Sequence, residues 1–198
     1  NDALIFDMDG TLWDATESYA TIWNRGYAEI GDSTRITGDE LKQYMGLALD
    51  EIYRKITSTK QEREALDAFL QRIDTIENNT MSQLGGFLYD YVPEGLKALS
   101  SRYRIFMLSN CGAEGVNNFL KYTGLGKYIE ASLTFGERSV PKGENLKYIA
   151  EKYSLLDPIY IGDTQGDCDE SHKAGMKFVY MTYGFGTCDN FDLKFDSF

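Results

Sequence analysis

Four short segments of this chain are largely apolar, and each ends abruptly in polar residues or glycine. They are residues 3–6 before Asp7, residues 104–108 before Ser109, residues 131–135 before Gly136, and residues 158–161 before Gly162. Apolar runs of this length are typical of strands buried on both faces of a parallel sheet. Residues 177–181 share the composition and predict a fifth strand.

Helical patterns separate these strands in the second half of the chain. They cover residues 93–101, 115–122 and 144–153. Regular alternation of strand and helix is the pattern of parallel βαβ units. The sequence therefore predicts an α/β fold with a doubly wound parallel sheet. Because 198 residues suffice for one main domain and a small insertion, we expect no second full-sized domain.

A long helical stretch interrupts the predicted sheet after its first strand. Helical periodicity covers residues 19–30, 40–44, 49–56 and 62–76. We therefore predict a core made of residues 1–14 and 89–198, with residues 15–88 inserted as a helical subdomain. The last segment, residues 187–198, is compatible with an edge strand, a docking tail or disorder.

The charge and cysteine content of the chain exclude several classes of function. A net charge of −11 argues against binding to nucleic acids or anionic membranes, which requires clustered Lys and Arg. Three cysteines without CxxC spacing indicate neither a disulfide framework nor a zinc site. No apolar run of membrane-spanning length and no signal-peptide pattern is present, so we expect a cytoplasmic protein.

Two carboxylates follow the first predicted strand, and they are the strongest candidates for chemistry. Asp7 and Asp9 are separated by one residue, so in an extended chain both side chains point to the same side. A carboxylate can attack phosphorus while a second acid protonates the leaving oxygen and later activates water. Asp7 suits the first role and Asp9 the second. Taken alone, this Asp-x-Asp-Gly segment is equally compatible with a surface turn.

The ends of the next two strands offer groups that could bind a phosphate. Ser109 and Asn110 can donate hydrogen bonds to phosphoryl oxygens, although the pair also suits a helix N-cap. Lys142 precedes a predicted helix and could offset negative charge, although an isolated lysine is usually a solvated one.

Two further acids follow the fourth strand. Asp163 and Asp167 are spaced to lie on one helical turn. Oxygen ligands of this kind suit Mg²⁺, which bridges to substrate phosphate. The alternative is a helix start whose acids interact with the helix dipole.

Taken in order, these segments resemble the four motifs of the haloacid dehalogenase superfamily of phosphatases. The matching sequences are DMDGTL at residues 7–12, Ser109-Asn110, Lys142, and GDTQGD at residues 162–167. The resemblance implies that Asp7 is the nucleophile and Asp9 the general acid/base. It further implies that Mg²⁺ is bound by the Asp7 side chain, the Asp9 backbone carbonyl, Asp163 and Asp167. The transferring phosphoryl group would be held by Ser109, Asn110 and Lys142.

The insertion resembles the small helical cap of the phosphoglycolate phosphatase-like branch, which closes over the active site. Residues 44–51 resemble the cap loop that faces that site. One departure concerns the lysine, because many members of this branch have Lys-Pro, whereas here Pro141 precedes Lys142. This departure bears less on the role of the lysine than on the subfamily to which the chain belongs.

The expected function is therefore Mg²⁺-dependent hydrolysis of a small phosphorylated metabolite through an aspartyl-phosphate. Phosphotransfer by a phosphosugar mutase is an alternative, but such mutases usually carry an apolar β-branched residue in place of Thr11. A non-catalytic phosphate-binding protein and a halide-removing enzyme are further alternatives, and the complete set of acids speaks against both. We expect a monomer or a homodimer.

Several other residues receive no functional role at this stage. His172, the single histidine, is expected to lie on the surface or to pack, and Cys111 and Cys168 carry no sign of a reactive thiolate. The helical spacing of Tyr19, Trp23 and Tyr27 is more typical of core packing than of a ligand-binding surface.

Overall fold

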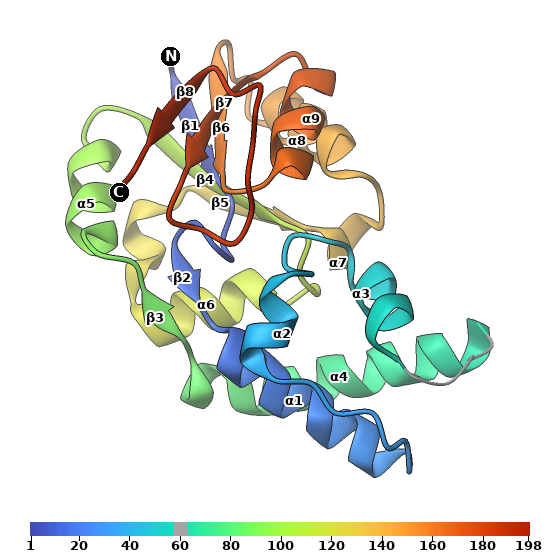
Figure 1. The fold of residues 1–198 in the computed structure, drawn as a ribbon. Helices are drawn as coiled ribbons and strands as arrows, with labels where there is room; N and C mark the ends of the chain where they lie inside the picture. Colours follow the sequence, from blue (N-terminus) through green and yellow to red (C-terminus); the bar gives the residue numbers. More distant parts are fainter. Residues whose placement is uncertain (58–62) are drawn as a thin grey trace.

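The computed structural model describes residues 1–57 and 63–198 of the chain. A six-stranded parallel sheet forms its centre, with the strand order β5-β4-β1-β6-β7-β8 (Figure 1). These strands are β1 (Ala3–Phe6), β4 (Arg104–Ser109), β5 (Ala131–Thr134), β6 (Pro158–Gly162), β7 (Lys177–Met181) and β8 (Leu193–Phe195). The predicted α/β class is confirmed, and all five predicted strands are present. The first strand of the chain lies at the centre of the sheet, between β4 and β6.

Helices cover both faces of this sheet because neighbouring residues of each strand point to opposite sides. Leu4 and Phe6 face the side of α5 (Val92–Ser100) and α6 (Gly115–Thr123). Ala3 and Ile5 face the side of α8 (Lys142–Lys152) and α9 (Gln165–Lys173). Both faces of β1 are therefore buried, which explains its uninterrupted apolar sequence. Two short elements, η1 (Leu125–Tyr128) and α7 (Phe135–Arg138), lie on either side of β5 in the chain.

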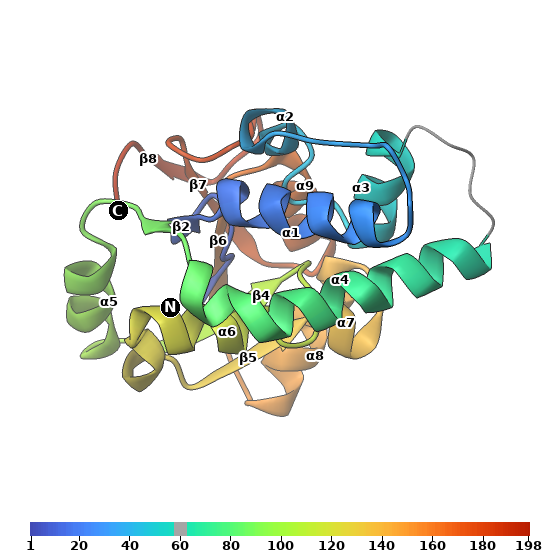
Figure 2. The ribbon, with the colours of Figure 1, turned by 90° about the horizontal axis from the view of Figure 1, so that it is seen from below.

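The described part of residues 15–88 folds into four helices beside the sheet. They are α1 (Thr16–Glu29), α2 (Gly38–Lys42), α3 (Leu49–Ile56) and α4 (Arg63–Leu84). Helices α1 and α4 pack side by side, as Figure 2 shows. Their contact is aromatic, because the ring of Phe69 lies 5.5 Å from that of Trp23 and 4.6 Å from that of Tyr27. No helix among residues 1–57 and 63–198 has the length and apolar character needed to span a bilayer.

A two-stranded antiparallel ribbon lies where the chain passes between the sheet and these helices. It pairs β2 (Trp13–Asp14) with β3 (Phe87–Leu88), so that Asp14 lies opposite Phe87. The ribbon lies at the two expected boundaries between core and insertion, after residue 14 and after residue 88. The division into a core and a cap stays a prediction at this point.

The structure shifts the bounds of several sequence-based elements: α1 starts at Thr16, α2 covers Gly38–Lys42 and α8 starts at Lys142. Helix α4 continues to Leu84, beyond the expected end at residue 76, and the expected start at residue 62 lies outside the described residues. The third predicted strand ends at Thr134 instead of 135, because Thr134 and Glu137 form a capping box that starts α7. Of the three alternatives for the terminal segment, the edge strand is correct, because β8 pairs with β7.

Replacing Phe106 with Ala is expected to destabilise the protein by about 3–5 kcal/mol, because it leaves a cavity in the core. Phe106 lies fully buried in β4, and its ring packs 5.0 Å from that of Tyr153. Denaturant unfolding measures the change. Phe87→Ala serves as the control, since Phe87 is 80% exposed and should change stability by no more than about 0.5 kcal/mol. Equal effects of the two changes would contradict the packing described here.

Candidate active site

The central strand β1 delivers Asp7 to the edge of the sheet where the parallel strands end. The Asp7 backbone N–H still donates to the carbonyl of Ile161 at 2.8 Å, so the residue continues the pairing with β6. Its side chain is buried, with Oδ1 at 3.6 Å from the Lys142 ammonium. In open α/β sheets this edge is where ligands bind.

The turn after Asp7 depends on a glycine. Gly10 has a φ of +82°, a left-handed conformation that favours glycine. A Cβ at this position would also collide with the Asp163 carboxylate. Beside it, the Thr11 hydroxyl donates to Asp163 Oδ1 at 3.4 Å. The segment of residues 7–12 is therefore packed directly against the segment of residues 162–167.

Three acids form a buried cluster at this edge. One carboxylate oxygen from each of Asp7, Asp163 and Asp167 lies within 4.8 Å of the other two. Burial and the neighbouring Asp167 raise the pKa of Asp163 to about 7. The Phe185 N–H, which donates to the Asp163 carboxylate at 2.7 Å, opposes this shift. Burial likewise raises the pKa of Asp7, and Lys142 opposes that shift. Hard, closely spaced oxygens of this kind fit a divalent cation.

Lys142 and Asp167 hold each other in place beneath Asp7. The Lys142 ammonium donates to Asp167 Oδ1 at 2.6 Å, and both side chains are almost completely buried. Burial lowers the pKa of Lys142, but Asp167 and Asp7 outweigh that effect and raise it well above its usual value. Asp167 Oδ2 accepts from the backbone N–H groups of Asp163 and Thr164, which orients the carboxylate. Pro141 precedes Lys142 here instead of following the lysine, and the Lys142 ammonium still lies 3.6 Å from Asp7.

The residues after β4 reach the same edge. Ser109 is buried at the end of the strand and lines a cavity together with Asp7. The Asn110 side-chain amide donates to the carbonyl of Gly46 at 3.0 Å, which ties it to the loop before α3. The structure therefore brings all seven residues singled out in the sequence to one end of the sheet.

Asp9 faces a different set of partners from Asp7. Its Oδ1 accepts hydrogen bonds from the Trp13 indole N–H at 3.0 Å and from the Tyr19 hydroxyl at 2.9 Å. Burial raises the pKa of Asp9 to about 6, although these two donors counteract the shift. An acid with a pKa near neutrality can both give and take a proton at physiological pH.

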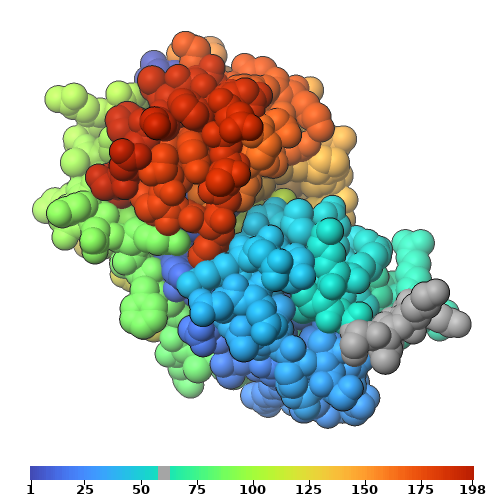
Figure 3. All heavy atoms as spheres, viewed as in Figure 1, coloured from blue at the N-terminus to red at the C-terminus, as the bar shows by residue number. Residues whose placement is uncertain are grey.

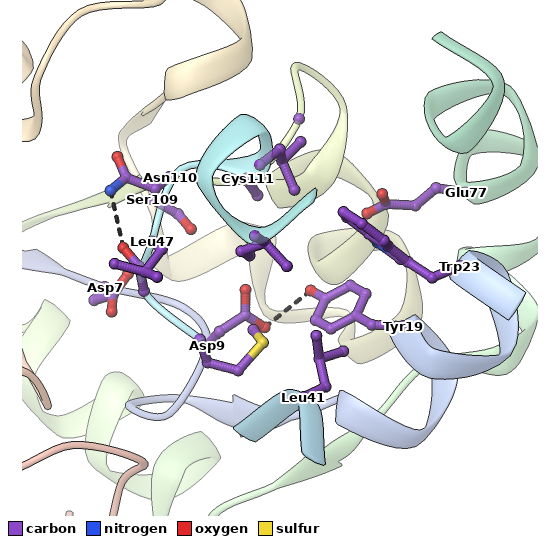
Figure 4. Close-up of a pocket in the computed structure, with 15 residues that line it drawn as sticks. Asp7, Asp9, Tyr19, Trp23, Leu41, Leu47, Glu77, Ser109, Asn110 and Cys111 are labelled. Atoms are coloured by element: carbon purple, nitrogen blue, oxygen red, sulfur yellow. Dashed lines mark hydrogen bonds between the residues drawn. The ribbon is translucent and has the colours of Figure 1, made fainter. Parts of the chain in front are cut away.

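A cavity of about 50 Å³ lies between this edge of the sheet and the helical insertion. Figure 4 shows Asp7 and Asp9 on one side of it, with Tyr19, Trp23 and Glu77 on the other. The rest of its wall comes from the loop and helices of the insertion and from the segment after β4: Leu41, Met45, Gly46, Leu47, Leu49, Ile52, Ser109, Asn110, Cys111 and Gly112. Figure 3 shows the insertion in contact with the core on this side of the molecule.

Two aromatic residues assigned to core packing also face the cavity. Tyr19 donates a hydrogen bond to Asp9, and Trp23 lines the cavity wall beside it. Tyr27, the third of the set, packs in the helical core as expected. Core packing is confirmed for all three, because Tyr19, Trp23 and Tyr27 belong to the buried hydrophobic cluster. What helical spacing could not show is that the inward face of α1 also meets the cavity at Tyr19 and Trp23.

Sequence reasoning also missed Glu77. This residue continues the inward face of α4 after Leu66, Phe69 and Ile73, and an acid on an apolar face is the signal that could have identified it.

The expectation for His172 holds, because this residue lies at the surface, at 2.8 Å from Asp192. Burial raises the pKa of the Cys111 thiol, so Cys111 is no thiolate although it lines the cavity.

Comparisons with known proteins agree with this geometry. Residues 4–181 match the family described as haloacid dehalogenase-like hydrolase. The chain is 25% identical over 189 residues to the phosphoglycolate phosphatase of Aquifex aeolicus, covering 92% of this chain and 85% of that protein. It is 23% identical over 176 residues to pyrophosphatase PpaX of Listeria monocytogenes, covering 86% and 78%.

The fold has close counterparts among solved structures. A Bacteroides fragilis protein described as a haloacid dehalogenase-like hydrolase superimposes with a TM-score of 0.85 at 22% identity. That similarity covers 98% of this chain and 96% of the other. At this identity the match supports the shared architecture, with its sheet and helical insertion.

Proposed function

This chain belongs to the haloacid dehalogenase-like hydrolases, and we propose that it hydrolyses small phosphomonoesters through an aspartyl-phosphate on Asp7. Its enzyme class is that of a phosphatase, as in its relatives. One observation carries the proposed mechanism: the buried Asp7 carboxylate faces the cavity, with Lys142 at 3.6 Å and Asp9 two residues further along. A nucleophile, a fixed cation and an acid thus share one site.

In the first step, an Asp7 oxygen attacks the phosphorus atom of the ester. A bond forms between that oxygen and phosphorus while the bond to the leaving oxygen breaks, and Asp9 gives its proton to the leaving oxygen. Oδ1 of Asp9 accepts from Trp13 and Tyr19, so we assign this proton to Oδ2. The aspartyl-phosphate and the free alcohol are the products of this step.

In the second step, water resolves the aspartyl-phosphate. Asp9, now a carboxylate, takes a proton from water as the water oxygen attacks phosphorus. The bond between phosphorus and the Asp7 oxygen breaks, which releases inorganic phosphate and restores Asp7. The pKa of about 6 suits Asp9 to both steps, because neither protonation state is strongly disfavoured near neutral pH.

Charge on the transferring phosphoryl group needs fixed donors and cations. Lys142 is held rigidly by Asp167 at 2.6 Å, so its position requires no reorganisation during the reaction. Ser109 and Asn110 present a hydroxyl and an amide from the end of β4. We assign these three residues to the binding of the phosphoryl oxygens.

The buried acids fit a Mg²⁺ ion. We propose that Asp7, Asp163, the Asp9 backbone carbonyl and Asp167 hold it, with Asp167 also anchoring Lys142. A bound Mg²⁺ offsets the charge of the carboxylates and of the phosphoryl oxygens. The raised pKa values of Asp7 and Asp163 reflect the cost of burying these carboxylates.

The helical insertion acts as a cap in this proposal. We assign residues 15–88 to the cap and residues 1–14 and 89–198 to the core. The hydrogen bond from Asn110 to Gly46 at 3.0 Å joins the two across the cavity. Leu41, Leu49 and Trp23 on the cap side exclude water from the reacting centre, which strengthens its electrostatic interactions.

Phosphate release from a panel of esters tests this function, and we expect it to require a divalent metal. Phosphoglycolate, pyrophosphate and sugar phosphates are suitable first substrates. Chelation should lower turnover by at least about 100-fold, because several kcal/mol of charge stabilisation are lost. Mg²⁺ should also raise the melting temperature of the native protein.

Asp163→Asn is the matched variant for the metal, and its melting temperature should respond less to Mg²⁺. Turnover that persists in a chelator, or a melting temperature indifferent to Mg²⁺, would argue against the metal site. The absence of phosphate release from every ester would argue against the proposed function itself.

A further inference from the structure

Helix α4 places one carboxylate in the cavity that has no partner among the described residues. Glu77 is 7% exposed and lines the cavity together with Asp9, Tyr19 and Trp23. Among residues 1–57 and 63–198, no hydrogen-bond donor or cation pairs with its carboxylate. Burying an unpaired acid is costly, and buried polar groups are generally satisfied by a partner. A partner from outside the chain is therefore expected.

The walls around Glu77 contain no positive charge. The described residues that line the cavity include no Lys, Arg or His. Lys142, the cation nearest to the nucleophile, is engaged with Asp167 and Asp7 beneath the cavity. Asp74, one turn before Glu77 on α4, adds a second acid close to Gly112 in the cavity wall. The end of the cavity away from Lys142 is therefore acidic.

Aromatic residues line the same cavity as this carboxylate. Figure 4 shows Glu77 and Trp23 on the opposite side of the view from Asp7, with Asp9 and Tyr19 between. The face of an aromatic ring attracts a cation, and indole does so most strongly. Glu77 and Trp23 thus provide the two features that favour an ammonium group: an anion and an aromatic face.

We infer that the leaving group of the substrate is small and carries an ammonium group, which Glu77 and Trp23 bind. This inference rests on the proposed phosphatase function and specifies its substrate class. The phosphoryl group would lie at Asp7 and Lys142, and the amine at the cap end of the cavity. The cavity volume of about 50 Å³ favours a leaving group of a few non-hydrogen atoms.

The electrostatics of Glu77 agree with this assignment. Burial, together with the charges of Asp74 and Asp9, raises the pKa of Glu77 to about 8. A bound ammonium favours the ionised carboxylate, so it relieves the cost of burial. A leaving group with its own carboxylate, such as that of phosphoglycolate, would instead add a negative charge beside Glu77, Asp74 and Asp9.

Three esters of similar size test the inference on the native protein: 2-aminoethyl phosphate, 2-hydroxyethyl phosphate and phosphoglycolate. Their leaving groups are positive, neutral and negative at neutral pH. We expect kcat/KM to be highest for the aminoethyl ester, by at least about tenfold over the hydroxyethyl ester, because a hydrogen bond to a charged partner is at stake. Phosphoglycolate should be the poorest of the three. Equal values for the three esters, or a preference for phosphoglycolate, would overturn the inference.

The Glu77→Gln variant tests the residue itself. It keeps the shape of the side chain and removes the negative charge that Glu77 carries when an ammonium is bound. The kcat/KM for the aminoethyl ester should therefore fall at least about tenfold, mainly through KM. The value for the hydroxyethyl ester should stay within about threefold, and that for phosphoglycolate should rise. Glu64→Gln, an exposed position on the same helix, is the matched control and should leave the ranking unchanged. An equal loss for all three esters would identify Glu77 as a structural residue and refute the inference.

The outcomes also separate this inference from the function on which it rests. p-Nitrophenyl phosphate serves as a general phosphatase substrate in parallel. If it is hydrolysed in a metal-dependent way while the three esters show no ranking by charge, only the substrate inference fails. If neither it nor any of the three esters releases phosphate, the proposed function fails and the inference falls with it.

Discussion

Replacing Asp7 with Asn is expected to lower phosphate release by about 10⁴-fold or more, because an amide cannot form the acyl phosphate. The change preserves the shape of the side chain and removes one charge from the acidic cluster of Asp7, Asp163 and Asp167. Since burial raises the pKa of Asp7, removing its charge should leave the fold at least as stable as before. A loss of activity with an unchanged melting temperature would therefore assign the effect to chemistry.

The covalent intermediate gives a second, independent measurement. Native protein quenched in acid during turnover should carry a phosphoryl group on Asp7, detectable by mass spectrometry of its peptides, and the Asn variant should carry none. Asp67→Asn, an exposed position on α4, is the control for the loss of one carboxylate and should retain full activity. Activity above about a tenth of the native value in Asp7→Asn would place the nucleophile elsewhere.

Replacing Asp9 with Asn should lower turnover by about 10²–10⁴-fold, the usual contribution of a general acid/base. The structure predicts that the side chain stays in place, because an amide oxygen can still accept from Trp13 and Tyr19. What disappears is the proton that Asp9 gives to the leaving oxygen and then takes from water. Asp39→Asn, which changes an exposed acid on α2, should leave turnover unaffected.

The leaving group distinguishes the two steps in this variant. An ester of an acidic phenol needs little protonation, so Asp9→Asn should form the aspartyl-phosphate from it and then hydrolyse it slowly. Rapid-quench measurements should then show a burst of phenol followed by slow phosphate release. Proportional loss of both phases for phenyl and alkyl esters alike would show that Asp9 acts in neither proton transfer.

Much of the fold was readable from local sequence because the buried sheet leaves a strong pattern. Continuous apolar runs such as residues 3–6 arise only where both faces of a strand are covered, and helices α8 and α6 provide that cover. Element boundaries were less accurate where side chains decide them. The start of α7 at Phe135 depends on the capping box of Thr134 and Glu137, which ends β5 one residue early.

The candidate site was predicted in part, for a similar reason. Parallel strands end at the same edge, so polar residues after Phe6, Leu108 and Ile161 had to converge. Glu77 and Tyr19 could not be placed in this way, because they come from helices of the insertion. Their positions depend on how α1 and α4 pack over the sheet.

The sequence by itself determined the α/β class, the order of the strands along the chain, and the acids and lysine at the strand ends. These features follow from residue period, polarity and chain direction, which are local properties. Only the tertiary structure decided that Lys142 lies between Asp7 and Asp167 and that Tyr19 donates a hydrogen bond to Asp9. It also decided that Glu77 lines the cavity without a partner among residues 1–57 and 63–198. The physical reason is that these contacts join residues 10 to 135 positions apart, and the burial that sets their pKa values exists only once the helical insertion packs onto the sheet.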